Sequence, residues 1–89
     1  MRGERGTVYL IHFHRAYHHA RHYLGWTADL SERIDRHASG NGSPLVRAVT
    51  AAGIGWTVVR TWVGVTRDFE RHLHKTKAGP RFCPVCLGR

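Results

Sequence analysis

Two short stretches near the start of the chain limit what it can fold into. Residues 7–13 (TVYLIHF) and 21–26 (RHYLGW) are rich in β-branched and aromatic residues and contain no proline. Such stretches favour β-strands. Only seven residues, HRAYHHA, separate them. Because a crossover to a parallel strand needs a longer connection, we expect an antiparallel pair joined by a polar hairpin loop.

Alternation along the first stretch predicts which side chains share a face. Successive side chains of a strand point to opposite faces. The odd-numbered residues from Tyr9 to Phe13 would therefore lie on one face, and the even-numbered residues from Val8 to His12 on the other.

Two helices are expected after the strand pair. In residues 27–40, Asp29 is followed three positions later by Glu32, a capping-box pattern, and Gly40 is a suitable stop. The apolar positions Leu30, Ile34 and Ala38 would form the buried stripe of this helix. Residues 43–53 begin with Ser-Pro and end with Gly, which predicts a second short helix.

The rest of the chain adds one strand, one helix and a tail. Residues 54–64 (IGWTVVRTWVG) predict a third strand. Residues 66–78 (TRDFERHLHKTKA) predict a third helix, begun by a threonine cap and with Phe69 and Leu73 facing inward. The order β-β-α-α-β-α predicts an α/β fold, a small three-stranded antiparallel sheet flanked by helices. Residues 79–89 form a tail that contains both cysteines.

The length and charge of the chain indicate one small domain with an anionic partner. Residues 1–89 have the length of a single domain. Fourteen Lys and Arg against six Asp and Glu give a formal charge of +8, which favours a polyanion. Twelve of these cations are arginine, whose planar fork fits phosphate, although a GC-rich genome would produce the same bias.

No stretch is apolar for the ~18 residues of a membrane span, and the N-terminal MRGERG lacks the apolar core of a signal peptide. We therefore expect a cytoplasmic protein that does not enter a membrane.

The two strand tyrosines carry a resemblance to a known family. Thr7-Val8-Tyr9 and Tyr23-Leu24-Gly25 resemble the two signature triplets of the GIY-YIG nuclease superfamily, with Thr-Val in place of Gly-Ile in the first. The similarity extends over about residues 7 to 77. It implies the same fold and a metal-dependent endonuclease that hydrolyses DNA phosphodiester bonds.

The resemblance also implies the site residues. Family members carry an arginine after the second tyrosine, then a His or Tyr four residues later, which correspond to Arg33 and His37. The family glutamate on the helix after the third strand corresponds to Glu70. Some members add an asparagine after that helix, but this chain has none beyond Asn41.

These residue types suit phosphodiester hydrolysis. Glu70 would bind Mg²⁺ or Mn²⁺ together with water and substrate, and Arg33 would hold the phosphate. In the family model Tyr9 accepts the proton of the attacking water, while Tyr23 positions the phosphate or the water. Because a phenol has a pKa near ~10, Tyr9 must be ionised by nearby positive charge or must pass its proton on, with His37 as the natural relay.

Each of these residues also has a purely structural interpretation. The tyrosines could be ordinary sheet residues, Arg33 could pair with Glu70, Asp29 or Glu32, and His37 could be a solvated helix residue. Cationic and aromatic residues expected to contact nucleic acid, DNA in the first place and RNA as an alternative, are Arg15, Arg21, Trp26, Arg36, Arg67, Lys75 and Lys77.

Cys83 and Cys86 form a CxxC pair, which is half of a zinc site. The other half could be His72 and His74, a second chain, or sequence beyond Arg89, and the alternative is two reduced thiols. Five of the eight histidines fall in residues 12–22, where they match no ligand spacing. We interpret that stretch as a hairpin loop that is solvated or touches nucleic acid.

Three functions follow from these patterns. The first is the endonuclease, acting as a monomer or a homodimer with little sequence selectivity. The second is a basic nucleic-acid-binding module without activity on the same scaffold. The third is a small zinc-stabilised interaction protein.

Overall fold

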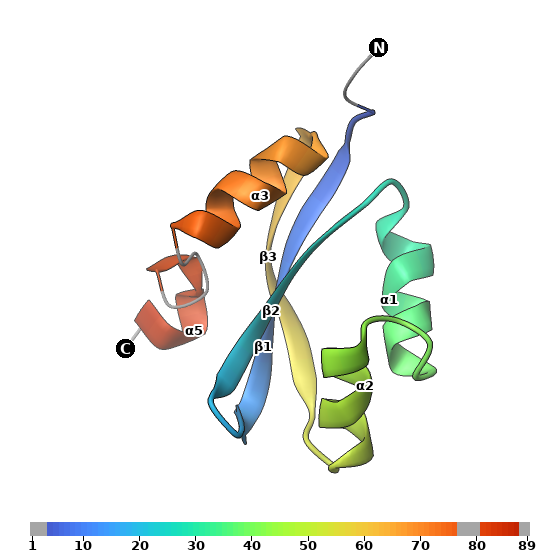
Figure 1. The fold of residues 1–89 in the computed structure, drawn as a ribbon, viewed down its shortest axis with the longest axis vertical. Coiled ribbons are helices and arrows are strands. Elements are labelled where there is room, and N and C mark those ends of the chain that lie inside the picture. Colours follow the sequence, from blue (N-terminus) through green and yellow to red (C-terminus); the bar gives the residue numbers. More distant parts are fainter. Residues whose placement is uncertain (1–3, 77–80, 88–89) are drawn as a thin grey trace.

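Three antiparallel strands form the central layer of the protein. The computed structural model describes residues 4–76 and 81–87. The strands are β1 (Gly6–Tyr17), β2 (Ala20–Thr27) and β3 (Trp56–Val65), in the spatial order β2-β1-β3 (Figure 1). Both neighbours of β1 run antiparallel to it, so the predicted α/β fold with a three-stranded antiparallel sheet is confirmed.

The hairpin between β1 and β2 is tighter than predicted. We expected a seven-residue loop, but both strands continue through most of it, and Tyr17 pairs with Ala20. The turn is made by two histidines, of which His18 has a φ of 56°. The strands extend this far because Tyr17 and Ala20 pack against the core on one face of the sheet, so continued pairing buries apolar surface.

The two helices after β2 begin at the predicted caps. Helix α1 (Leu30–Ala38) begins after Asp29, whose side chain accepts a hydrogen bond from the amide of Glu32 at 3.1 Å. Helix α2 (Pro44–Ala51) begins after Ser43, whose side chain caps it in the same way. In α1 the third position of the predicted stripe, Ala38, is exposed.

The last two helices differ from the prediction in two ways. Helix α3 (Arg67–Lys75) begins after Thr66 as expected, but the threonine side chain makes no capping hydrogen bond. The tail forms a further short helix, α5 (Pro84–Leu87). Phe69 and Leu73 of α3 pack toward the core, as predicted.

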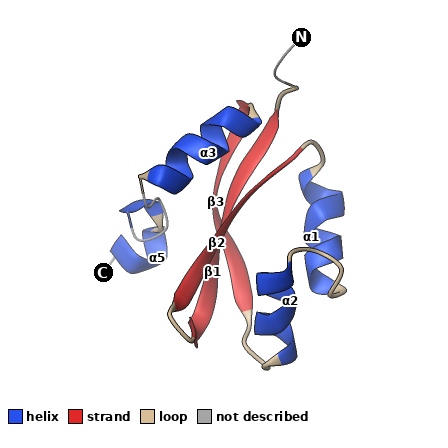
Figure 2. Ribbon diagram, viewed as in Figure 1, coloured by secondary structure: helices blue, strands red, loops and turns tan. Residues whose placement is uncertain are grey.

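The helices form two outer layers, one on each face of the sheet. Helices α1 and α2 cover one face, and α3 and α5 lie across the other (Figures 1 and 2). The core has two parts accordingly: Tyr9, Ile11 and Phe13 of β1 pack with α2, while Val8 and Leu10 pack with α3 and the tail. The predicted alternation along β1 is thus confirmed.

No helix in residues 4–76 or 81–87 has the length and apolar character needed to cross a membrane.

Candidate active site

Tyr9 and His37 meet in the core between the sheet and α1. Tyr9 points from the central strand toward the α1–α2 layer, and His37 lies in the last turn of α1. The Tyr9 hydroxyl is 2.8 Å from Nε2 of His37. Both residues are buried, with exposed fractions of 0% and 1%. His37 is therefore not the solvated helix residue of the structural interpretation.

Tyr23 and Arg33 complete the surroundings of the Tyr9 hydroxyl. The rings of Tyr9 and Tyr23 lie 6.1 Å apart, and that of Tyr23 lies 5.5 Å from the imidazole of His37. Arg33, one turn before His37 on α1, is close enough to the Tyr9 hydroxyl to act on its pKa. The structure therefore brings together four of the five residues predicted from the resemblance.

Two glycines leave the space that this cluster occupies. A Cβ atom on Gly25, the last residue of the second triplet, would lie 2.5 Å from the Tyr9 hydroxyl. A Cβ atom on Gly42 would overlap the ring of His37. Because neither clash can be relieved without moving a buried ring, both positions require glycine, which has no side chain.

The environment keeps both buried groups uncharged near neutral pH. Burial, and then the neighbouring Tyr23, raise the pKa of Tyr9 to about 12, although Arg33 acts in the opposite direction. Burial, and then the positive charge of Arg33, lower the pKa of His37 below its ordinary value. The pair is therefore a phenol and a neutral imidazole in the protein alone.

Arg33 is held without an acidic partner. Its Nε atom is buried and makes no hydrogen bond. The ion pairs found within the described ranges do not include Arg33, and Glu32 pairs instead with Arg36 at 2.8 Å. A buried guanidinium nitrogen without a partner is costly, so the Nε atom of Arg33 is a candidate donor to a ligand.

Glu70 lies in a different layer from the other four predicted residues. It is on α3, which packs against the opposite face of the sheet from Tyr9 and α1. Its side chain is 23% exposed, and its Oε2 atom lies 3.9 Å from Nε2 of His74. In the part of the chain that the structure describes, no hydrogen bond or ion pair links Glu70 to the tyrosines, Arg33 or His37.

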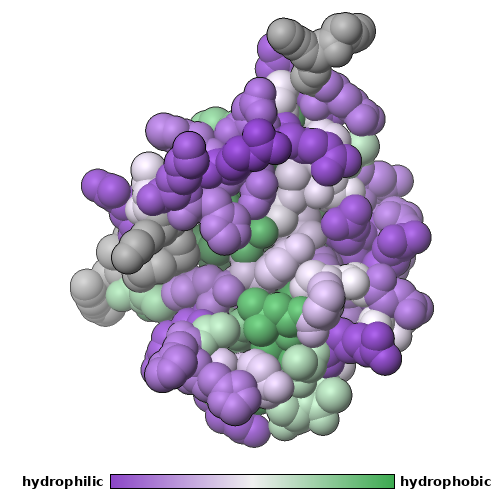
Figure 3. All heavy atoms as spheres, in the orientation of Figure 1, coloured by the Kyte–Doolittle hydropathy of each residue, from purple (hydrophilic) through white to green (hydrophobic). Residues whose placement is uncertain are grey.

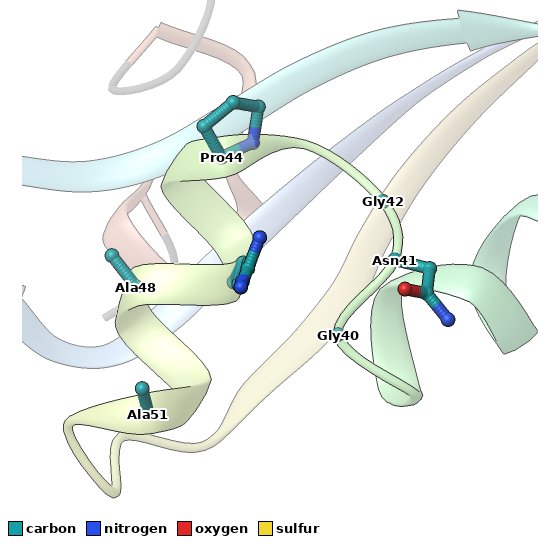
Figure 4. Close-up of a pocket in the computed structure, with 7 residues that line it drawn as sticks. Gly40, Asn41, Gly42, Pro44, Ala48 and Ala51 are labelled. Carbon is teal, nitrogen blue, oxygen red and sulfur yellow. The ribbon is translucent and has the colours of Figure 1, made fainter.

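A hollow beside the cluster is formed by the loop between α1 and α2. Figure 4 shows the loop of Gly40, Asn41 and Gly42 beside α2, whose residues Pro44, Ala48 and Ala51 also line the hollow. None of the predicted catalytic residues lines this hollow. The candidate site therefore consists of Tyr23 and Arg33, which are partly exposed, and of Tyr9 and His37, which are buried.

Six of the seven residues predicted to contact nucleic acid lie within the described ranges, and they differ in exposure. Arg15, Arg21 and Lys75 are exposed, as a contact with phosphate requires. Arg36 is exposed but pairs with Glu32, and Lys77 lies outside the described residues. Most of the face shown in Figure 3 is hydrophilic, with a smaller hydrophobic area near its centre.

Trp26 was wrongly predicted as a surface contact. It is only 8% exposed, packs in the core beneath α3, and donates from Nε1 to the carbonyl of Val65 at 3.0 Å. The guanidinium of Arg67 lies 4.4 Å from the centre of its ring. Arg67 therefore covers a core tryptophan as well as presenting a charge to solvent.

The two cysteines lie beside histidines other than those predicted. Cys83 and Cys86 are grouped with His12 and His22, and all four ligand atoms lie within 4.8 Å of one another. His74 instead approaches Glu70, so the prediction of His72 and His74 as the partners was wrong. The set has the residue types that can bind a metal ion such as zinc.

Sequence reasoning missed His12 and His22 because it assigned their stretch to a loop. The two residues lie directly opposite each other in the β1–β2 ladder. Burial is the largest cause of a lowered pKa in both. The alternation along β1 did place His12 on the same sheet face as Val8 and Leu10. It could not indicate that the cysteines lie beside His12, because they are 71 and 74 positions away in the sequence.

Comparisons with family models, curated proteins and solved structures found nothing that matches this chain.

Proposed function

We propose that this domain is a metal-dependent endonuclease of the GIY-YIG type that hydrolyses phosphodiester bonds in DNA. The observation that carries the proposal is the contact between the Tyr9 hydroxyl and Nε2 of His37, beside a guanidinium without an acidic partner. A phenol, an imidazole and an arginine at one place provide a proton acceptor and a phosphate ligand.

Arg33 would bind the scissile phosphate. Its fork can donate two parallel hydrogen bonds to phosphate oxygens, and no carboxylate among the described residues competes for it. Tyr9 is fully buried in the protein alone, so the reaction requires one of its covering side chains to move. Rotation of Arg33 outward to the phosphate would open the hydroxyl to the attacking water.

His37 would act as a hydrogen-bond donor to Tyr9. The amide of Ser43 donates to Nδ1 of His37 at 3.4 Å, which leaves the proton of the neutral ring on Nε2, facing Tyr9. A donor at this position stabilises the ionised phenol. This arrangement favours ionisation of Tyr9 with loss of its proton to solvent, because Nε2 of His37 already carries a proton and cannot accept another without becoming charged.

Tyr9, once its own proton has passed to solvent, would then take a proton from the water as the water oxygen attacks phosphorus. The bond from phosphorus to the leaving oxygen breaks, and that oxygen takes up a proton from solvent. Tyr23, at the surface of the cluster, would orient the phosphate or the water. A divalent cation bound to the substrate would stabilise charge on the phosphate and on the leaving oxygen.

The residues present do not form a complete cation site by themselves. Glu70 belongs to no group of three or more potential ligands in residues 4–76 and 81–87. A single carboxylate can hold Mg²⁺ only together with water and phosphate oxygens. Glu70 would therefore hold the cation through its one carboxylate, with water and the substrate phosphate as the other ligands.

Nicking of supercoiled plasmid tests the proposal. We expect protein dialysed free of Mg²⁺ to be inactive and to regain activity when Mg²⁺ or Mn²⁺ is added back. Addition is preferable to EDTA, because EDTA would also remove a metal bound by the cysteines. Glu70→Ala should abolish nicking, and Glu32→Ala, which removes an exposed carboxylate on α1, should not.

A wild-type protein that never nicks DNA with either metal would contradict the proposal. So would a Glu70→Ala variant with full activity.

A second candidate is a nucleic-acid-binding module without hydrolytic activity. It is favoured by the complete burial of Tyr9 and by the position of Glu70 on the opposite layer. Gel retardation of DNA and RNA without strand cleavage, weakened in Arg33→Ala, would support this function instead.

A further inference from the structure

We propose that His12, His22, Cys83 and Cys86 bind one structural zinc ion that fastens the C-terminal segment to the β1–β2 hairpin. The site lies outside the candidate active site, and none of the proposed catalytic residues takes part in it. It joins His12 of the first strand to two cysteines more than 70 positions away.

Four of the six distances between the ligand atoms match those of a tetrahedral zinc centre. His12 Nδ1 and His22 Nε2 are 3.3 Å apart. Cys83 Sγ and Cys86 Sγ lie 3.4 and 3.8 Å from His12 Nδ1, and Cys86 Sγ lies 3.5 Å from His22 Nε2. Bond lengths of about 2.05 Å to nitrogen and 2.3 Å to sulfur place tetrahedral ligands about 3.3 Å (N to N) and 3.6 Å (N to S) apart.

Hydrogen bonding does not account for this arrangement. Nδ1 of His12 has three close neighbours, His22 Nε2 and both sulfur atoms. A neutral imidazole nitrogen has one lone pair or one proton, so it can satisfy only one of the three. Thiols are also weak donors. A shared cation at the centre satisfies all four groups at once.

The backbone around the four residues holds them in place. His12 and His22 are opposite each other in the antiparallel ladder, which brings side chains on the same face close together. Cys83 is fully buried in the core cluster with Val8 and Leu10. CxxC is the common spacing for two zinc ligands from one segment.

Other contacts hold the C-terminal segment against the same face. The ring of Phe82 lies 5.9 Å from that of Trp62, and the guanidinium of Arg60 lies 5.1 Å from the Phe82 ring. These contacts position Cys83, but α5 itself has only four residues and cannot be stable alone. A zinc ion bound by Cys83 and Cys86 would stabilise α5 against the sheet.

The charges of the site suit zinc in a basic protein. Two thiolates and two neutral imidazoles balance the charge of Zn²⁺, so the ion adds no net charge beside Arg21. Nitrogen and thiolate ligands favour zinc over Mg²⁺ or Mn²⁺, which prefer oxygen. This site is therefore chemically distinct from the cation expected at Glu70.

Metal analysis of the full chain tests the proposal. We expect about one zinc per chain after purification in reducing buffer with zinc present, as for a closed four-ligand site. Replacement by Co²⁺ should give the visible bands of tetrahedral cobalt and a thiolate charge-transfer band. Cys86→Ser, at an exposed position, and His22→Ala should each lose most of the bound zinc.

Matched controls separate the cluster from the other histidines. His19→Ala changes the exposed hairpin turn, and His72→Ala removes one of the histidines first predicted as ligands. Both should keep the wild-type zinc content. Circular dichroism establishes that each variant is folded.

Two results would overturn the proposal: wild-type protein that remains metal-free in reducing buffer with zinc, or Cys86→Ser and His22→Ala that bind as much zinc as wild type. The outcome is independent of the proposed nuclease, because the cluster and the Tyr9–His37 pair lie on opposite faces of the sheet.

Discussion

The hydroxyl of Tyr9 on the central strand lies 2.8 Å from Nε2 of His37 on α1, although the two residues are 28 positions apart. Both residues are buried, so water does not compete for this hydrogen bond. This pair joins the sheet to the first helix at the place where the proposed chemistry would occur.

Tyr9→Phe should abolish nicking with little change in fold. The ring keeps its volume, but the reaction loses its proton acceptor, a contribution of about 10²–10⁴-fold in rate for general bases. The free energy of unfolding should fall by about 1–3 kcal/mol, because buried Nε2 of His37 loses its partner. Plasmid nicking and urea unfolding measure the two effects.

Tyr17→Phe is the matched control for Tyr9→Phe. Tyr17 is on the same strand but lies at the hairpin turn against His18. Equal loss of activity in both variants would show that Tyr9 has no special role.

Gly25→Ala should disturb the cluster directly. A Cβ atom there would lie 2.5 Å from the Tyr9 hydroxyl and 2.6 Å from its Cζ atom. Overpacking of this kind costs about 1–3 kcal/mol, so the melting temperature and the nicking rate should both fall. Calorimetry and the plasmid assay provide the measurements.

Gly55→Ala is the matched comparison for Gly25→Ala, because the added Cβ atom would be crowded to a similar degree. Its Cβ atom would lie 2.6 Å from the ring of His14, but that side chain is exposed and can rotate away. We expect a smaller loss of stability there than at Gly25. If Gly25→Ala were as stable and active as wild type, the close packing around Tyr9 would not matter for function.

Arg33 should matter for both binding and cleavage, unlike Arg36 on the same helix. Arg33→Ala removes the proposed phosphate ligand, and we expect nicking to fall by about 100-fold or more, as for loss of a donor to a developing charge. Arg33→Lys keeps the charge but not the fork, so it should recover only part of the activity.

Arg36→Ala breaks an exposed ion pair with Glu32 and should cost at most about 1 kcal/mol of stability. Fluorescence anisotropy with labelled DNA and the nicking assay compare the variants. If Arg33→Ala and Arg36→Ala lost activity equally, Arg33 would act only through general charge.

Tyr9 should make the protein less stable at alkaline pH. Its pKa is about 12 in the folded protein and about 10 in an unfolded chain. The unfolded state therefore loses its proton first, and stability falls as pH rises from about 10 toward 12. Below pH 10 the phenol is neutral in both states and contributes no pH dependence.

Urea unfolding of wild type and Tyr9→Phe at two pH values isolates this effect. Between about pH 9 and 11, wild type should lose roughly 1 kcal/mol more than Tyr9→Phe, because other groups titrate equally in both proteins. Parallel losses in the two proteins would mean that the Tyr9 hydroxyl ionises as it does in water.

Local patterns in the sequence predicted most of the fold. Alternation in residues 7–13 assigned Tyr9 and Val8 to opposite faces, and the side chains of Asp29 and Ser43 do cap α1 and α2. These features depend on residues close in sequence, whose conformational preferences are nearly independent of the rest of the chain. The hairpin was predicted less well, because packing of Tyr17 decided where the strands end.

The sequence alone determined the three strands, the helices α1, α2 and α3, their order and the alternation of side chains along residues 8–13 of β1, because backbone sterics and side-chain periodicity act locally. Only the tertiary structure decided that Nε2 of His37 reaches Tyr9, that Glu70 belongs to the opposite layer, and that His12 and His22 accompany the cysteines. Such contacts depend on register, on sheet twist and on the face each helix covers. Those are set by the packing of the whole chain, so spacing along the sequence does not reveal them.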